Sequence, residues 1–183
     1  MRMPLITTDE FYNLTGKSDT EIYRDMLEGL LDAASGMVEI KLARKLALGD
    51  YVQRRFHSGR VVLLEAYPVK EISRVLMDDK PVESWQLDEN AGILRLPWHM
   101  EGLLQVEYRG GMEPIPMAIR QACALIALSL NSAIENSGQT VMSERLDGYQ
   151  MMYYQPAQNG QQMSVSPAAD ALLTPWKNRR IGG

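Results

Sequence analysis

The side chains that most often do chemistry in proteins are few in this chain and lie far apart in the sequence. There are two histidines, His57 and His99, and a single cysteine, Cys123. Neither histidine has a second ligand at the spacing of a zinc site, so we interpret both as surface imidazoles. Cys123 cannot form a disulfide within the chain, and its place inside an apolar run predicts a packed thiol rather than a nucleophile.

Two pairs of adjacent acids are the other candidates, because paired carboxylates bind Mg²⁺ or act as acid and base. Asp78-Asp79 and Asp88-Glu89 both lie in turn-like segments, where aspartate accepts hydrogen bonds from its own backbone. We interpret both pairs as turn formers; a carboxylate-dependent hydrolase would need the first pair as metal ligands. The sequence has no G-x-S-x-G, H-E-x-x-H or Walker A motif. We therefore expect no enzyme activity, no cofactor and no metal.

The net charge of the chain is −4 at pH 7, which argues against wrapping of nucleic acid by the whole surface, because such binding neutralises many phosphates. Two short basic clusters remain. Arg54, Arg55 and Arg60 form one, and residues 177–180 form the other. Clusters of this length are typical of a solvated strand face or a charged tail. They keep open one alternative function, that of a nucleic-acid-binding packaging or regulatory protein.

The length and composition fit one globular domain. The chain has 183 residues, of which 45% are hydrophobic and 23% charged. The longest uncharged run, residues 121–134, is shorter than the roughly 20 residues that cross a bilayer. The first residues lack the apolar segment of a secretory signal. We expect an intracellular origin and no membrane contact.

Capping signals predict two helices within a helical region that covers residues 5–48. Thr7 or Thr8 with the acids that follow predicts a short helix ending at Gly16. Ser18 and Glu21 have the spacing of a capping box, and apolar residues recur at helical intervals from there to residue 46. The second helix is therefore expected to be long.

After residue 50 the apolar pattern changes to a period of two, which predicts strands. The predicted strands cover residues 51–57, 60–65, 72–77, 85–87, 93–96 and 103–108. Ser58-Gly59 has the pattern of a two-residue hairpin turn, and Pro68 should interrupt pairing because proline cannot donate to a ladder. These features predict a small antiparallel β-meander over about residues 51–109.

A second long helix follows the meander, over residues 115–137. Gly110-Gly111, which is typical of a turn rather than an anion cradle, separates it from the last strand. No charged residue occurs from Gln121 to Ile134, and a helix that is apolar all round is usually buried on all sides. In a chain of this size, either a thick core or neighbouring copies of the same protein can bury it. Leu125 and Leu128 are candidates for such a contact between copies.

Two glycines in the first long helix raise the question of what packs against that helix. Gly29 and Gly36 lie seven residues apart, hence near one face, and each costs roughly 1 kcal/mol in a helix relative to alanine. Close approach by another helix would explain both, and simple tolerance of glycine explains them equally well.

The remaining segment, residues 138–183, is expected to be partly flexible. Residues 141–154 fit a strand or a helix, and residues 168–176 predict a last short helix. Together these elements predict a single α+β domain over residues 1–183. We expect it to be mainly helical, with two long helices, short terminal helices and the inserted β-meander.

The order of these parts resembles the head-tail connector, or adaptor and head-completion, family of long-tailed double-stranded DNA phages and prophages. The resemblance covers about residues 5–180. It rests on the long capped helix followed by Tyr67-Pro68-Val69, Val106-Glu107-Tyr108-Arg109-Gly110-Gly111, Pro116-Met117-Ala118-Ile119-Arg120-Gln121-Ala122, Ser143-Glu144-Arg145-Leu146-Asp147-Gly148-Tyr149 and Leu172-Leu173-Thr174-Pro175-Trp176-Lys177-Asn178-Arg179-Arg180. Tryptophan stands at 176 where the family more often has tyrosine.

This resemblance implies a structural virion protein that forms a ring of about twelve or thirteen copies beneath the portal, in the neck of the particle. The ring would continue the DNA channel, contact packaged DNA transiently, and carry a head-completion (stopper) or tail-completion protein below. Before assembly the chain would be in the host cytoplasm. Gly29, Gly36, Leu125 and Leu128 are then candidates for the contact between copies.

The resemblance also suggests two further groups of contact residues. The candidates for docking to the portal are Leu172, Leu173, Trp176, Lys177, Arg179 and Arg180. The candidates for the wall of the DNA channel are Arg54, Arg55 and Arg60.

Overall fold

The computed structural model describes residues 4–19, 22, 24–135, 143–146, 149–152 and 165–177. The chain separates into two compact units, which we describe one at a time. The helical unit comprises residues 1–38 and 117–175, and the sheet unit comprises residues 39–116 and 176–183. The predicted α+β class is confirmed. The prediction of a mainly helical fold is wrong, because strands hold nearly as many residues as helices.

Helix α1, Thr8–Thr15, has the predicted start and end. The Thr7 hydroxyl accepts a hydrogen bond from the Glu10 backbone at 3.2 Å, and the Glu10 carboxylate accepts one from the Thr7 backbone at 2.9 Å. This reciprocal pair satisfies two of the free N–H groups at the helix N-terminus. Gly16 ends the helix with φ +68°, in the left-handed region that glycine adopts without strain.

Helix α2, Arg24–Leu42, is shorter than the predicted span of residues 18–46. At its C-terminal end, Ala43 has φ +51°, which stops the helical hydrogen bonding. The Glu39 carboxylate then accepts hydrogen bonds from the Leu46 backbone at 3.0 Å and from Lys45 Nζ at 3.2 Å. These contacts hold the chain in a turn where the apolar pattern alone predicts more helix. Glu21 lies outside the described residues, so the predicted capping box stays a prediction.

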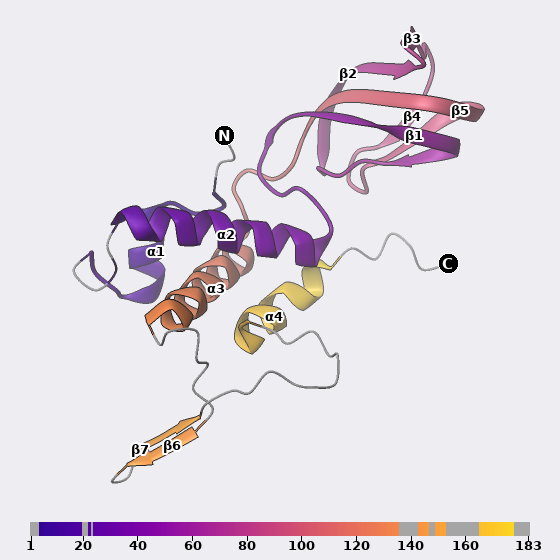
Figure 1. The fold of residues 1–183 in the computed structure, drawn as a ribbon. Helices are drawn as coiled ribbons and strands as arrows, with labels where there is room; N and C mark the ends of the chain where they lie inside the picture. Colours follow the sequence, from indigo (N-terminus) through magenta and orange to yellow (C-terminus); the bar gives the residue numbers. More distant parts are fainter. Residues whose placement is uncertain are drawn as a thin grey trace. The chain divides into compact units, whose positions relative to one another are not determined.

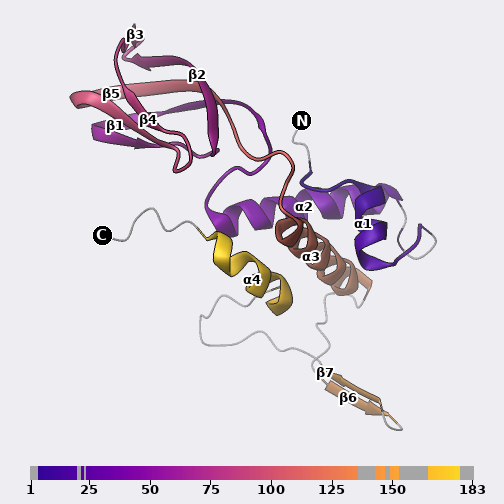
Figure 2. The same ribbon diagram turned by 180° about the vertical axis from the view of Figure 1, so that it is seen from behind.

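Helix α3, Met117–Glu135, is the core helix of the helical unit and confirms the predicted apolar helix. It lies between α1 and α4, Pro167–Leu173, which is followed by the short 3₁₀ helix η1, Thr174–Trp176 (Figures 1 and 2). Within the described part of the chain, α3 alone is long and apolar enough to cross a bilayer, a test that buried core helices also pass. Its contacts with α1 and α4 identify it as such a core helix.

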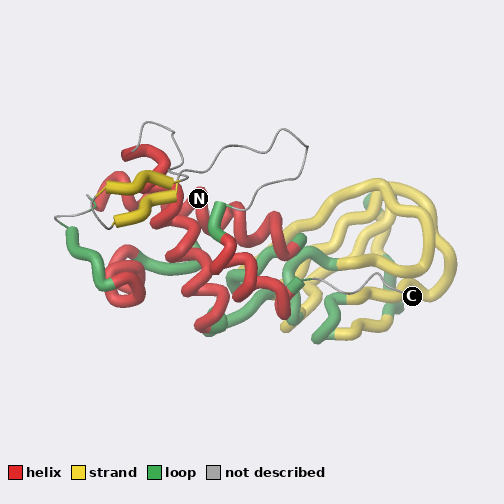
Figure 3. Tube along the Cα trace, turned by 90° about the horizontal axis from the view of Figure 1, so that it is seen from below, coloured by secondary structure: helices red, strands yellow, loops and turns green. Residues whose placement is uncertain are grey.

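The sheet unit contains five antiparallel strands: β1 Gly49–Leu63, β2 Val69–Met77, β3 Lys80–Pro81, β4 Gln86–Asp88 and β5 Ile93–Gly110. The strand order is β1-β5-β2-β3, and β4 also pairs with β5. Figure 3 shows these strands curling around one another. The core of the sheet unit consists of Val62, Leu64, Ala66, Tyr67, Val69, Val75, Met77, Leu94, Leu96, Leu104, Val106 and Tyr108.

The predicted hairpin at Ser58-Gly59 is wrong. Ser58 pairs with Glu101 and Gly59 with Met100, so β1 continues through this point, and its register shifts between Gly59 and Val61. The glycine marks a bulge that bends a long strand, which is a second common role of glycine in a strand. In the same way, the predicted strands 93–96 and 103–108 are two ends of the single strand β5.

Gln53 stabilises this bend. Its side-chain amide donates a hydrogen bond to the Leu63 carbonyl at 3.0 Å, and its carbonyl accepts one from the Glu65 backbone at 3.1 Å. Gln53 is 8% exposed. The buried Gln53 side chain therefore links the first half of β1 to the end of β1 and to the segment that follows it. The strand ladder does not make this link.

Gly110 and Gly111 lie where three backbone segments meet, residues 45–47, 66–68 and 110–112, which we call the backbone junction. A Cβ at Gly110 would lie 2.6 Å from the Ala66 carbonyl oxygen, and one at Gly111 would collide with the Ala47 carbonyl. Gly111 also has φ +107°. Its N–H donates to the Pro68 carbonyl at 2.9 Å. The pair is thus a site of close backbone packing.

Residues 141–154, for which the sequence left strand and helix open, contain two short antiparallel strands. They are β6, Ser143–Leu146, and β7, Tyr149–Met152. The predicted last helix is confirmed by α4 together with η1.

Candidate assembly surfaces

One face of α3 is less buried than the rest of the helix. Its residues follow one another at intervals of three or four, which places them on a single stripe. We call this the α3 stripe; it consists of Met117, Gln121, Leu125, Leu128, Ser132 and Glu135. Leu125 and Leu128 are half-buried, whereas Ile119 and Ile126 on the opposite face are at most 1% exposed. The described chain therefore leaves part of its most apolar helix accessible to another molecule.

Two polar contacts fix the orientation of α3 in the helical unit. Arg120 Nη1 donates to Glu10 Oε1 at 2.9 Å, which ties α3 to the start of α1. The Thr7 backbone hydrogen bond, with help from Arg120, holds the pKa of Glu10 below its usual value, while partial burial opposes this shift. The second contact involves Cys123.

Cys123 is a packed thiol, as predicted. Its Sγ lies 3.6 Å from Ser35 Oγ on α2, and the thiol is fully buried. The Ser35 hydroxyl donates to the Leu31 carbonyl at 2.6 Å and accepts from the Leu5 backbone at 2.9 Å. Burial raises the pKa of Cys123 to about 11, so the thiolate that a nucleophile requires is suppressed at neutral pH.

The two candidate glycines of α2 differ in their surroundings. Gly29 is exposed, and a Cβ built there would meet no atom within 4 Å. Gly36 is half-buried. No other part of the described chain packs closely on Gly29, so a helix that packs closely at that position would have to come from outside the described residues.

The C-terminal candidates are only partly accessible. Leu173 is fully buried on α4, Leu172 and Trp176 are half-buried, and Lys177 is exposed. Arg179 and Arg180 lie outside the described residues. Among the described candidates, Lys177 is thus the one freely accessible to a partner.

The three basic candidates of β1 do not form one patch. Residues alternate between the two faces along a strand, so Arg54 and Arg55 point to opposite sides. Arg55 donates to the Leu63 carbonyl at 3.2 Å, on the same side as Gln53. Arg54 lies on the other side with Val52 and Phe56, and Arg60 is exposed beside the bulge.

The interpretation of His57 as a surface imidazole is wrong. The long strand β1 turns its side chain to the buried face, where it is 9% exposed, and its Nε2 has no hydrogen-bond partner in the described structure. Burial lowers the pKa of His57, and the nearby Arg55 charge lowers it further. His99 is exposed, as predicted, and its Nε2 lies 3.4 Å from Ser58 Oγ.

The lowered pKa of His57 predicts a pH-dependent stability. In the unfolded chain His57 binds a proton near pH 6.5, whereas in the folded chain it does so only at lower pH. The free energy of unfolding should therefore be fully retained above about pH 6.5, the unfolded pKa, and should fall as the pH drops from there through the folded pKa. Urea unfolding of the wild type and of His57→Leu at pH 7.5 and pH 5 measures the difference, and equal losses in both proteins would contradict the prediction.

The paired acids act as turn formers, as predicted. Asp78 Oδ1 accepts from the Leu103 backbone at 2.8 Å, and Asp78 and Asp79 have φ of +49° and +63°. Asp88 Oδ1 accepts from the Ala91 backbone at 3.1 Å. Within the described ranges, no three His, Cys, Asp or Glu side chains come close enough to hold a metal ion.

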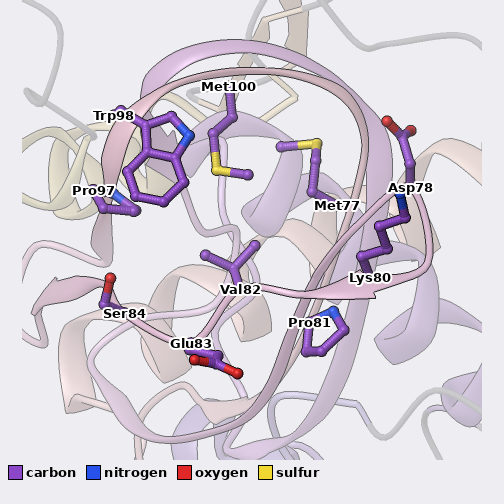
Figure 4. A pocket seen from close by; sticks show the side chains of 10 residues that line it. All are labelled: Met77, Asp78, Lys80, Pro81, Val82, Glu83, Ser84, Pro97, Trp98 and Met100. Carbon is purple, nitrogen blue, oxygen red and sulfur yellow. The ribbon is translucent and has the colours of Figure 1, made fainter.

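Sequence patterns did not reveal the exposed apolar surface of the sheet unit. Val52 and Phe56 are each 67% exposed and Trp98 is 63% exposed. Trp98 borders a pocket of about 460 Å³, whose lining residues are Met77, Asp78, Lys80, Pro81, Val82, Glu83, Ser84, Pro97, Trp98 and Met100 (Figure 4). We call it the Trp98 pocket. A large exposed apolar side chain beside a pocket, as Trp98 is here, is typical of an interaction site.

The family of the chain follows from its sequence. A sequence model of the head completion protein family matches residues 4–141. The chain belongs to the head completion protein family. The predicted resemblance is therefore confirmed, and so is the predicted function as a structural protein of the head-tail region. The alternative of a nucleic-acid-binding packaging or regulatory protein has no support here. No curated protein matches the chain.

Solved structures show that other virion proteins share the fold of this head completion protein. A chain in the neck of an empty gene transfer agent (GTA) particle, solved with C6 symmetry, is 20% identical with a TM-score of 0.64, covering all of this chain and 95% of that chain. A chain in the neck of a native GTA particle, solved with C12 symmetry, is 18% identical with a TM-score of 0.58. The match covers 100% of this chain and 98% of that chain. A chain from the native virion is 18% identical with a TM-score of 0.61, covering 100% and 95%.

Proposed function

We propose that this head completion protein is the adaptor subunit of a virion neck, where its copies form a closed ring beneath the portal and continue the DNA channel toward the tail. The observation that carries the proposal is the family match over residues 4–141. The shared fold with chains from the necks of phage-like particles supports it. Because those necks were solved with sixfold and twelvefold symmetry, we propose twelve copies rather than thirteen.

The α3 stripe is the proposed contact between copies in the helical unit. A ring requires that two different surfaces of each subunit meet. Leu125 and Leu128 supply an apolar surface that is only half-buried in a single copy, and the exposed Gly29 supplies a flat position on α2 that a neighbouring helix can approach closely. We assign these residues, with Gly36, to that contact.

The partners above and below the ring are proposed from the C-terminal segment and the charges. Lys177 is assigned to docking on the portal, together with Leu172, Trp176, Arg179 and Arg180 near it in sequence. Leu173 is buried, so it would hold α4 in place behind them. A stopper or tail-completion protein would bind the opposite side of the ring.

The net charge of −4 fits a channel through which DNA slides without being gripped, with Arg54, Arg55 and Arg60 as the candidates for transient phosphate contacts. The helical unit and the sheet unit would together make up one connector subunit.

Mass spectrometry and cryo-electron microscopy of purified particles test this proposal. We expect this chain in the particles at about twelve copies, located between portal and tail. Particles that assemble fully without the chain, or that carry it outside the neck, would overturn the proposal. Binding of the purified chain to DNA that weakens steeply with salt would instead favour the nucleic-acid alternative.

A further inference from the structure

An exposed stripe on β1 and a pocket at another place on the sheet unit are candidates for one contact between copies. The stripe consists of Val52, Arg54 and Phe56, which alternation places on the face opposite to the buried Gln53 and His57. We call it the β1 stripe. An exposed apolar pair of this kind on a long strand is unfavourable in water and usually marks a contact surface.

The Trp98 pocket has the lining that an aromatic side chain prefers. Met77, Val82, Trp98 and Met100 converge on the same space from separate segments (Figure 4). Two methionine sulfurs and one indole offer contacts that are favourable toward an aromatic ring. A volume of about 460 Å³ lies in the range of pockets that hold small ligands, so it has room for an aromatic side chain.

Phe56 is the phenylalanine of this chain that is free to occupy such a pocket. The chain has two phenylalanines, and Phe11 is fully buried in the helical unit, whereas Phe56 is 67% exposed. Phe56 does not line the pocket of its own chain, so its ring would enter the pocket of a second copy.

Charged side chains lie beside both surfaces: Arg54 on the stripe, and two carboxylates, Asp78 and Glu83, with Lys80 around the pocket. Arg54 lies between Val52 and Phe56, and its side chain forms no hydrogen bond or ion pair with the described residues. Glu83 borders the pocket beside Val82 and is likewise without an ion pair among the described residues. Entry of Phe56 into the pocket would bring this arginine toward this carboxylate. Complementary charges at such a contact fix its register and exclude other pairings.

We propose that neighbouring copies in the ring contact each other through their sheet units, with Phe56 of one copy in the Trp98 pocket of the next and Arg54 paired with Glu83. The proposal rests on the proposed ring and adds a second contact to the α3 stripe. Two different surfaces meet in this contact, so it is heterologous, which is the kind that closes into a ring. It also assigns Arg54 to the contact between copies and leaves Arg55 and Arg60 to the DNA channel.

Disulfide cross-linking in assembled particles tests the contact. The double variant Phe56→Cys/Val82→Cys has a reactive thiol on each surface, while the native Cys123 is buried and unreactive. Oxidation should produce a ladder of dimers and larger products on a non-reducing gel. The matched control, Lys70→Cys/Val82→Cys, places the first thiol at another exposed sheet position and should give no ladder. Particles that contain the ring but yield no product above the control would overturn the proposal.

A charge exchange tests the pairing of Arg54 with Glu83. Arg54→Glu and Glu83→Arg should each reduce incorporation of the chain into particles by about tenfold, because each places like charges together. The double variant should restore incorporation to within about twofold of the wild type. Failure of the double variant to restore incorporation, with both single variants folded by circular dichroism, would contradict the pairing. Absence of the wild-type chain from particles would overturn the proposed function instead, so the two failures are distinguishable.

Discussion

Replacing Gly111 with alanine should unfold the sheet unit or reduce its stability by about 3 kcal/mol or more. The backbone at this position has φ +107°, where a side chain is strained, and the added Cβ would collide with the Ala47 carbonyl. Relief of that collision would require the backbone junction to open. The hydrogen bond from the Met112 backbone to the Leu46 carbonyl, 2.7 Å long, would then be lost.

Chemical unfolding followed by tryptophan fluorescence measures this effect, because Trp85 and Trp98 both belong to the sheet unit. Gly29→Ala is the matched control. Gly29 is a helical glycine with no atom within 4 Å of its would-be Cβ, so alanine should stabilise the chain by roughly 0.5–1 kcal/mol. Equal free energies of unfolding for Gly111→Ala and the wild type would contradict the prediction, because they would mean that the backbone junction accommodates the added Cβ without loss.

Replacing Leu128 with aspartate should strongly reduce assembly while leaving a folded chain. Leu128 is half-buried on the α3 stripe, so in a single copy the carboxylate can reach water, and the loss of apolar burial should cost about 1–2 kcal/mol. In the ring the same carboxylate would face an apolar surface without a partner. We therefore expect at least about a tenfold drop in the amount of chain incorporated into particles.

Ile126→Asp is the matched variant on the opposite face of the same helix. Ile126 is 1% exposed, and an unpaired carboxylate there should destabilise the fold by about 4 kcal/mol or more. Circular dichroism and particle incorporation of the two variants, measured side by side, separate an assembly defect from a folding defect. If Leu128→Asp unfolds as fully as Ile126→Asp, the stripe belongs to the core of the single copy.

Local signals in the sequence predict the elements that depend on neighbouring residues. The capping box of Thr7 and Glu10 lies within one turn of helix, and the apolar run of α3 covers a whole element, so both can be recognised without the rest of the fold. The long strand β1 shows the limit of such signals. Ser58-Gly59 has the local pattern of a hairpin turn, but pairing with β5 over both sides of the bulge determines the structure.

The same limit explains the errors at individual side chains. His57 is buried because β1 continues past residue 57 and pairs with β5 on both sides of it. The predicted hairpin at Ser58-Gly59 ended the strand there, so the burial of His57 was not predicted. Val52 and Phe56 share their strand face with Arg54 and resemble an ordinary mixed strand face. The Trp98 pocket is formed by two separate segments, residues 77–84 and 97–100, so no local pattern indicates it. The turn role of Asp88 could be predicted, because its carboxylate accepts from a backbone N–H three residues further on. The bond from the Leu103 backbone to Asp78 is long-range and could not be predicted.

The backbone junction has a consequence for how such a protein can acquire new parts. The segments by which the chain enters and leaves the sheet are hydrogen-bonded to each other, from Met112 to Leu46. An inserted unit whose two ends lie side by side connects to the receiving domain as a short loop does. The entropic cost of closing a loop grows only slowly with its length, so the size of the insert matters little. The sheet unit could thus be gained, exchanged or enlarged in evolution without redesign of the helices that precede and follow it.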